Sequence, residues 1–511
     1  MNARTGLTAR EIWTLFVVCS GVALVIAAMA ALNSALPAIA LDTGATQGEL
    51  TWIIDSYTLT LAALLLPAGA LGDRYGRRGV LLIGLAIVGI ASLGPIWLDS
   101  PTWIIAFRAF AGVGAAFMMP ATLSLLVATF PPEHRARGVA IWAGVAAIGG
   151  IAGMVISGLM LEHWSWQSIF VGFAVGAIGL FVVTWTIPPS RAEHPPRMDV
   201  PGSLLSVGAV GGFVLGMLEG PLRGWSDPLP VTALVTAVVC GTAFVVVELR
   251  RTEPLLDVRL FGNRGFSAGS LSMTLQFLAS FAMFFLVVQY MQLVRGFSPL
   301  MSGIALAPMV IPVMGMSAVV PWLLPRVGLR WLSVVGLSLT GVGMFAFATI
   351  DADSGYWTTV WCLMIYAFGL GLCTAPATHA IVENTPEDKQ GVASAVNDTT
   401  REVGAAIGIA LAGSLLASTY SREIAPAVDA VPEAAKEPVG SSLAAALEVA
   451  KMAGPQGEQL ADFARSAFMA GMSNAAYVLG GILLVAAVAV GICAPARRAA
   501  TPVPEEPALV D

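Results

Sequence analysis

The chain consists largely of long apolar segments, and these constrain its fold more than any other feature. A helix of about 20 apolar residues crosses the hydrocarbon core of a bilayer. Apolar runs separated by Pro, Gly and charge clusters are therefore candidate membrane spans. We predict fourteen spans, at 13–36, 52–71, 80–98, 103–128, 139–161, 167–187, 201–220, 229–249, 268–293, 302–324, 331–350, 357–382, 392–418 and 474–495. The sequence thus predicts an all-α polytopic membrane protein.

The composition excludes the main soluble classes of protein. Only 11% of the 511 residues are charged, whereas soluble domains carry about 25%. A water-soluble fold of this size could not cover its surface with so few charges, and the net charge of −6 argues against a nucleic-acid partner. The sequence contains no P-loop, metal-binding cluster or nucleophile triad. We therefore expect no enzymatic activity, no cofactor and no metal.

Basic residues in the predicted loops indicate the orientation. If the N-terminus is cytoplasmic, 18 of the 26 Lys and Arg residues fall in inside segments, and only Arg223 and Arg295 fall in short outside loops. Positive charge is retained on the cytoplasmic side of membrane proteins. We therefore predict a multi-pass protein of the inner (cytoplasmic) membrane, in contact with membrane lipids, with both termini cytoplasmic.

An internal repeat divides the chain into two similar halves. The stretch from Gly112 to Thr122 recurs from Gly369 to Thr378, and Arg74–Arg78 has a weaker echo in Arg326–Arg330. Such a repeat predicts two six-helix bundles with two further helices between them. The predicted domains are a cytoplasmic N-terminus (1–12), an N-terminal bundle (13–190), two inserted helices with linkers (191–266), a C-terminal bundle (267–495) containing an external loop or hairpin (419–473), and a disordered cytoplasmic tail (496–511).

The loop after the second span carries a glycine- and arginine-rich motif, which begins at Gly69. Its glycines permit a tight turn, its arginines can anchor the inner leaflet, and Asp73 can cap a neighbouring helix or pair with an arginine. We predict that this motif latches the two halves in one conformation, although a plain positive-inside loop would look similar. The predicted latch residues are Gly72, Asp73, Arg74, Gly76, Arg77 and Arg78.

This loop resembles the signature loop of the major facilitator superfamily. Trp52–Tyr57, Arg108 followed by Gly112-Val-Gly114, and Leu256–Phe261 are similar to motifs of its fourteen-helix drug:proton antiporter family, in the branch that exports quaternary ammonium compounds and other drugs. The resemblance covers nearly the whole chain. It implies the major facilitator fold, with 14 transmembrane helices in a 6+2+6 order, and proton-driven efflux of small amphiphilic, hydrophobic or cationic substrates. We expect a monomer.

We single out five charged residues inside the predicted spans, where each charge costs roughly 2.5–3.5 kcal/mol on insertion scales. We predict that Asp55, Arg108, Asp398 and Glu402 couple transport to protons; for Arg108 the resemblance implies this role. Asp398 and Glu402 share one helix face, with Arg401 between them in sequence. The alternatives are a snorkelling carboxylate for Asp55, a structural ion pair on the thirteenth span, and a helix anchor for Arg108.

Aromatic and polar residues within spans are candidates for a substrate cavity, because such side chains can hold amphiphilic drugs. Each one could equally serve helix packing. The predicted substrate-binding residues are Asn33, Trp52, Tyr57, Trp142, Gln276, Gln289 and Tyr290.

Three positions depart from the family pattern. Ala28 stands where many members carry an acidic residue, Met154 replaces a proline, and Val313 occupies a position that is a carboxylate in some dication exporters. These departures weaken the expectation of a dication substrate. They leave open a dedicated exporter of one lipid or natural product with weak or no proton coupling, and a receptor or scaffold that has lost transport.

Overall fold

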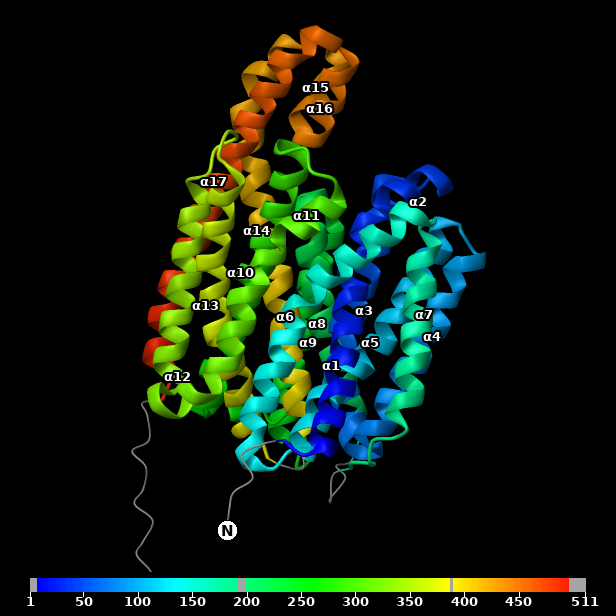
Figure 1. Ribbon diagram of the computed structural model, residues 1–511, viewed down its shortest axis with the longest axis vertical. Helices are drawn as coiled ribbons and strands as arrows, with labels where there is room; N and C mark the ends of the chain where they lie inside the picture. Colours follow the sequence, from blue (N-terminus) through cyan, green and yellow to red (C-terminus); the bar gives the residue numbers. More distant parts are fainter. Residues whose placement is uncertain (1–6, 192–197, 387–388, 496–511) are drawn as a thin grey trace, which may run out of the picture.

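The protein is a bundle of long helices that run side by side along its long axis (Figure 1). The computed structural model describes residues 7–191, 198–386 and 389–495, and all regular structure within them is helical. Thirteen helices among the described residues are long and apolar enough to cross a membrane. The all-α membrane architecture is therefore confirmed, while the predicted tail 496–511 and the first six residues lie outside the described ranges.

The first half of the chain supplies six long helices and one short one. Two of the long helices begin with capping boxes, in which Thr8 pairs with Glu11 and Thr46 pairs with Glu49, so the free N–H groups of the first turn are satisfied. The helices are α1 (Ala9–Ala30), α2 (Leu36–Thr43), α3 (Gln47–Tyr75), α4 (Arg77–Trp97), α5 (Pro101–Thr129), α6 (Pro132–His163) and α7 (Gln167–Thr184).

Two inserted helices and the second half follow. The inserted helices are α8 (Val200–Arg223) and α9 (Pro228–Arg250). The remaining long helices are α10 (Arg264–Gln289), α12 (Val310–Ala348), α13 (Tyr356–Glu383), α14 (Gln390–Ala430) and α17 (Glu458–Cys493), with the short α11 (Pro299–Leu306) before α12. The predicted count of fourteen is not matched element by element. The predicted spans 302–324 and 331–350 both lie in one continuous segment, whose backbone leaves the helical region at Gly328 (φ 84°, ψ 162°).

Equivalent positions of the repeat have equivalent geometry. Gly76, between α3 and α4, has φ 107°, and its counterpart Gly328 has φ 84°; glycine adopts such angles without the penalty that a Cβ imposes. Arg78 donates to the carbonyl of Ile187 just after α7 (2.7 Å), and Arg330 donates to that of Ala494 just after α17 (2.7 Å). In each half, an arginine thus binds the end of the last helix.

The segment 419–473 is helical over most of its length. Helix α14 continues to Ala430, α15 (Glu433–Ser441) and α16 (Leu443–Met452) turn back, and α17 begins at Glu458. These elements project from one end of the bundle, while α1 begins and α17 ends at the other (Figure 1). The Tyr420 hydroxyl donates to the carbonyl of Val439 (3.0 Å), which fixes α15 to α14.

Helix α14 occupies a central position in the molecule. It belongs to the C-terminal half, where it packs against α10 and α17, but it also contacts α3 and α5 of the N-terminal half. The inserted helix α8 packs against both α3 and α14. Polar groups on α14 can therefore meet groups from either half and from the insertion.

Candidate functional site

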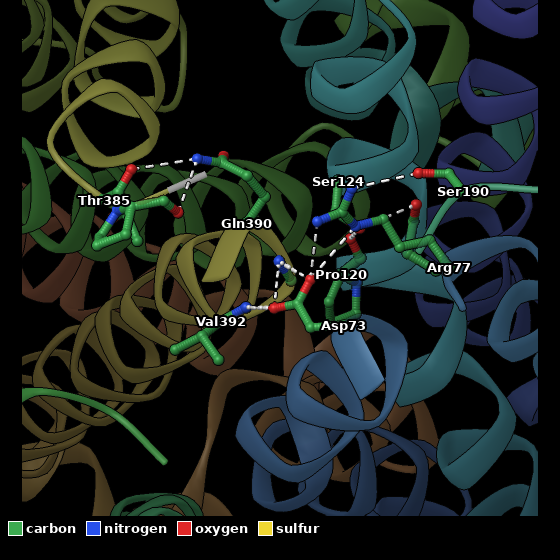
Figure 2. A network of polar contacts seen from close by, with 11 residues as sticks. Asp73, Arg77, Pro120, Ser124, Ser190, Thr385, Gln390 and Val392 are labelled. Atoms are coloured by element: carbon green, nitrogen blue, oxygen red, sulfur yellow. Dashed lines mark hydrogen bonds and ion pairs between the residues drawn. The ribbon is translucent and has the colours of Figure 1, made fainter. Parts of the chain in front are cut away.

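At the inner end of the bundle, the Asp73 carboxylate of α3 binds the N-terminus of α14. Asp73 is fully buried. The Gly391 N–H donates to both of its oxygens (2.8 Å each), and the Val392 N–H donates to Oδ2 (3.1 Å). Arg77 Nη2 lies 3.0 Å from Oδ1 on the other side, as Figure 2 shows. Helix N-termini carry free N–H groups and partial positive charge. Asp73 thus both caps a helix and pairs with an arginine, the two contacts predicted as alternatives.

The contact depends on a close approach of two helix backbones. A Cβ on Gly391 would lie 2.4 Å from the Gly69 carbonyl oxygen and 2.8 Å from the Asp73 carboxyl carbon, and a Cβ on Gly69 would lie equally close to the Gly391 oxygen. Only glycine fits at such distances, so the small residues position α3 against α14.

The other residues of the motif fix its surroundings. The Arg77 backbone N–H and Nη1 donate to Ser190, to its carbonyl oxygen (2.9 Å) and hydroxyl (3.2 Å). Arg74 lies over the Tyr75 ring at 5.5 Å. The buried Gly72 accepts, through its carbonyl, the N–H of Gly76 at the end of α3 (3.0 Å). The motif therefore joins α3, α4, the segment after α7 and α14.

In the N-terminal half, Arg108 of α5 is 2% exposed. Its Nε donates to the Ile53 carbonyl (3.0 Å), and its guanidinium carbon lies 4.2 Å from the centre of the Tyr57 ring. The Tyr57 hydroxyl in turn donates to the Val25 carbonyl of α1 (3.0 Å). Arg108 Nη2 is buried without a hydrogen-bond partner. The arginine is held by a carbonyl and an aromatic face, which agrees with the helix-anchor alternative and leaves one donor free.

In the C-terminal half, Asp398, Arg401 and Glu402 form a buried cluster on α14. All three are at most 5% exposed. Arg401 Nη1 lies 3.4 Å from Asp398 Oδ1, and Asn397 Nδ2 donates to the same oxygen (3.2 Å). Asp398 Oδ2, Glu402 Oε2 and Arg401 Nε are buried without partners. Because buried polar groups are normally hydrogen-bonded, this cluster retains capacity to bind a proton or a ligand.

Arg401 lies between aromatic rings from the two halves. Its guanidinium carbon is 4.4 Å from the centre of the Phe277 ring on α10 and 5.6 Å from that of Trp142 on α6. Beside Phe277, Gln276 accepts a hydrogen bond from the Thr374 hydroxyl of α13 (2.8 Å). Trp142 Nε1 donates to Thr122 (3.2 Å). One predicted substrate residue, Trp142, is thus brought next to the α14 charges, whereas Gln276 joins α10 to α13.

The two charge groups meet at the interface between the halves. Helix α14, which carries Glu402, contacts α3 and α5, which carry Tyr57 and Arg108, and the Arg108 guanidinium lies over the Tyr57 ring. The buried charges therefore form one polar region that crosses the interface, although the sequence separates Arg108 from Glu402 by nearly 300 positions.

Asp55 has an acidic neighbour that the sequence analysis missed. A Cβ on Gly211 of α8 would lie 3.2 Å from the Ala63 Cβ of α3, so the two helices are in contact there. Helices α3 and α8 correspond to the second and seventh predicted spans, which cross the membrane in opposite directions. Half-buried Asp55 and buried Glu219 are each eight residues from this contact and therefore lie at one level.

Both Glu219 and a second acid, Glu248, could have been found from the sequence. Each lies inside a predicted span, at 201–220 and 229–249, so the rule that singled out Asp55 applies to them equally. Arg223, one turn after Glu219, forms an ion pair with it. The count of five charges within the spans was therefore too low.

Three other predicted substrate residues have their described contacts elsewhere. Tyr290 is fully buried in the core of the C-terminal half, edge-on to Phe347. Asn33 is exposed and donates to the Ala30 carbonyl (3.1 Å), and Gln289 donates to that of Phe285 (3.3 Å). Trp52 is half-buried in the second turn of α3, next to Ile53, whose carbonyl binds Arg108.

Comparisons with known proteins agree with this architecture. The family model of the Major Facilitator Superfamily matches residues 18–409. The chain is 34% identical to the tetracenomycin C resistance and export protein of Streptomyces glaucescens, over 94% of this chain and 91% of that protein. It is 30% identical to the methyl viologen resistance protein SmvA of Salmonella typhimurium, over 89% and 93%. A crystal structure of a double-tryptophan mutant of XylE superposes with a TM-score of 0.62 at 15% identity, covering 96% of each chain.

The family match covers most of the chain, and both relatives align over nearly their whole length. The chain is therefore a multi-pass transporter of the cell inner membrane and not an enzyme, and it belongs to the major facilitator superfamily.

Proposed function

We propose that this transporter exports amphiphilic drugs or hydrophobic and cationic compounds from the cytoplasm, driven by protons. The observation that carries the proposal is the cluster of Asp398, Arg401 and Glu402, which is buried at the interface of the halves and retains unpartnered polar atoms. Buried charges are costly in a membrane and usually mark ion or substrate pathways. The relatives are named as resistance and export proteins, which supports a small-molecule substrate.

Protons would be exchanged at the carboxylates Asp55, Asp398 and Glu402. A proton that crosses the membrane gains about 2.3 kcal/mol per 100 mV from the electrical potential. Protonation of Asp398 would remove the charge that faces Arg401 at 3.4 Å, and the freed arginine would then reorganise the interface between the halves. Arg108, held on Tyr57 close to Glu402, would sense the same change.

The substrate would bind where aromatic and charged groups from both halves converge. Trp142 and Phe277 offer ring faces to a flat or cationic molecule. Gln276 lies on α10 and Tyr57 on α3. Asn33, Trp52, Gln289 and Tyr290 remain predicted contacts only. A site shared by both halves is suited to alternating access, because each rocking motion exposes it to one side.

The latch motif would stabilise the conformation that is closed to the cytoplasm. Asp73 bridges α3 and α14 only while their inner ends are together. Opening toward the cytoplasm would break these contacts and leave the α14 N-terminus uncapped. These contacts therefore lower the free energy of the closed conformation, and the binding of substrate or proton must compensate for their loss on opening.

Proton flux in proteoliposomes tests this function. We expect a transported dye to change the internal pH of vesicles that contain the wild-type protein. The Asp398→Asn/Glu402→Gln variant should lose this coupling, whereas Asp353→Asn, which alters an exposed loop acid, should retain it. Absence of any pH change with every transported compound would exclude proton coupling.

A second candidate is a dedicated exporter of one natural product with weak or no proton coupling. Two observations favour it: Arg401 already neutralises Asp398, and Ala28 provides no carboxylate in α1. Export that persists in the presence of an uncoupler, for a single compound in a broad panel, would support this candidate over the first.

A further inference from the structure

A second pair of carboxylates lies at the inner end of the inserted helices, outside the site described above. Asp199 immediately precedes α8, and Glu248 lies in the last turn of α9. Asp199 is 2% exposed and Glu248 is 1% exposed. Two acids so deeply buried require specific partners, because an isolated buried charge is strongly disfavoured.

Each carboxylate uses one oxygen for a structural contact. Asp199 Oδ1 accepts the Gly202 N–H (2.9 Å) and lies 3.3 Å from Arg251 Nη1. Glu248 Oε2 accepts the Leu256 N–H (3.1 Å). Asp199 therefore caps α8, and Glu248 binds the linker that leads to the C-terminal half.

The second oxygens of the two groups face one another. Asp199 Oδ2 and Glu248 Oε1 are both buried without a partner. A Cβ on Gly202 would lie 2.7 Å from the first and 2.2 Å from the second. Both oxygens thus converge on the space that the missing side chain of Gly202 leaves open.

The basic residues described beside the pair engage it on one side. Arg251 lies 3.3 Å from Asp199 Oδ1, and its side chain is 40% exposed. Arg259 donates to the Leu249 carbonyl (3.1 Å), Lys389 donates to the Pro254 carbonyl (3.2 Å), and Arg250 is exposed at the end of α9. Two adjacent buried carboxylates whose second oxygens face one another are best satisfied by a single proton between them.

We propose that Asp199 and Glu248 bind one proton between Oδ2 and Oε1, and that this proton holds the linker 251–257 against the inserted helices. Leu255 and Leu256 are 4% and 5% exposed and pack in one cluster with Phe266 of α10 and Val392 of α14. The proton therefore fastens the linker beside the helix end that Asp73 caps. The inference is independent of the transported substrate and of proton-coupled export.

Infrared spectroscopy of the purified full-length protein tests the shared proton directly. In a background of Asp55→Asn/Asp398→Asn/Glu402→Gln, the spectrum at neutral pH should contain the C=O band of a protonated carboxyl group. Adding Glu248→Gln or Asp199→Asn should remove the intensity of one such group, because an amide N–H then replaces the shared O–H. Unchanged intensity in both variants would overturn the proposal.

The pH dependence of thermal unfolding provides a second measurement. A native state that holds an extra proton loses stability as the pH rises through its release. In the Asp55→Asn/Asp398→Asn/Glu402→Gln background the protein should show this loss, adding Glu248→Gln should abolish it, and adding the exposed control Glu162→Gln should leave it unchanged. A loss that persists in Glu248→Gln, or failure of both amide variants to fold, would contradict a proton that an amide can replace.

Discussion

The carboxylate of Asp73 accepts the backbone N–H of Gly391 with both oxygens, across 318 residues of sequence. The bond joins the two halves of the transporter at one end. Charge-assisted hydrogen bonds of this kind contribute about 1.5–3 kcal/mol each, so their loss should shift a conformational equilibrium measurably.

Asp73→Asn should favour the conformation open to the cytoplasm. The amide loses both the ion pair with Arg77 and the negative charge at the α14 N-terminus. We expect at least a tenfold shift of the equilibrium, measured as the distance distribution between spin labels at the inner ends of α3 and α14. Asp353→Asn should leave the distribution unchanged, and an unshifted Asp73→Asn would rule out the latch.

Features that depend on one segment alone, or on the repeat between segments, could be predicted from the sequence. Apolar length located the spans, and the repeat offset predicted that Gly76 and Gly328, and likewise Arg78 and Arg330, would be equivalent. The motif also indicated that Asp73 would cap a helix, but not which one, because that choice depends on the crossing of α3 and α14 at Gly391.

Contacts between distant helices escaped prediction. Arg401 lies near both Trp142 and Phe277, which requires α6 and α10 of opposite halves to approach α14. The periodicity of a sequence does not predict which helices approach one another. Tyr290 was predicted to bind substrate because it is a polar aromatic residue inside a span; its ring packs in the core of the C-terminal half, and its role in binding stays a prediction. Which face of a membrane helix meets protein depends on packing between segments.

The contact between Arg401 and the Phe277 ring should affect substrate affinity through the ring as well as through the charge. Arg401→Lys keeps the charge but loses the guanidinium group that faces the Phe277 ring, and Phe277→Leu keeps an apolar side chain but loses the ring. Since a buried cation–π contact contributes about 0.5–2 kcal/mol, each should change the KM of a flat cationic dye several-fold. Phe345→Leu, whose ring contacts Tyr477 elsewhere in the C-terminal half, is the matched control; equal effects in all three would indicate general loosening.

Glu219 should act through Asp55. If the two carboxylates influence each other across the α3–α8 contact, Glu219→Gln should alter the pH profile of transport in the wild-type background and have no further effect in Asp55→Asn. A double-mutant cycle with the half-maximal pH as readout measures this coupling. Additive shifts in the two backgrounds would show that Glu219 only supports α8 through its ion pair with Arg223.

Gly76 and Gly328 should tolerate replacement poorly, because of their backbone angles. Their positive φ angles are strained for any residue with a Cβ, at a cost of about 1–3 kcal/mol. Gly76→Ala and Gly328→Ala should each lower the unfolding temperature. Gly481→Ala in α17 should not, because a Cβ there meets nothing within 4 Å and alanine favours a helix. Since the two glycines occupy equivalent turns of the repeat, similar losses are expected. An unchanged unfolding temperature in Gly328→Ala would mean that α12 can run straight through this position, and that the predicted spans 302–324 and 331–350 form one helix.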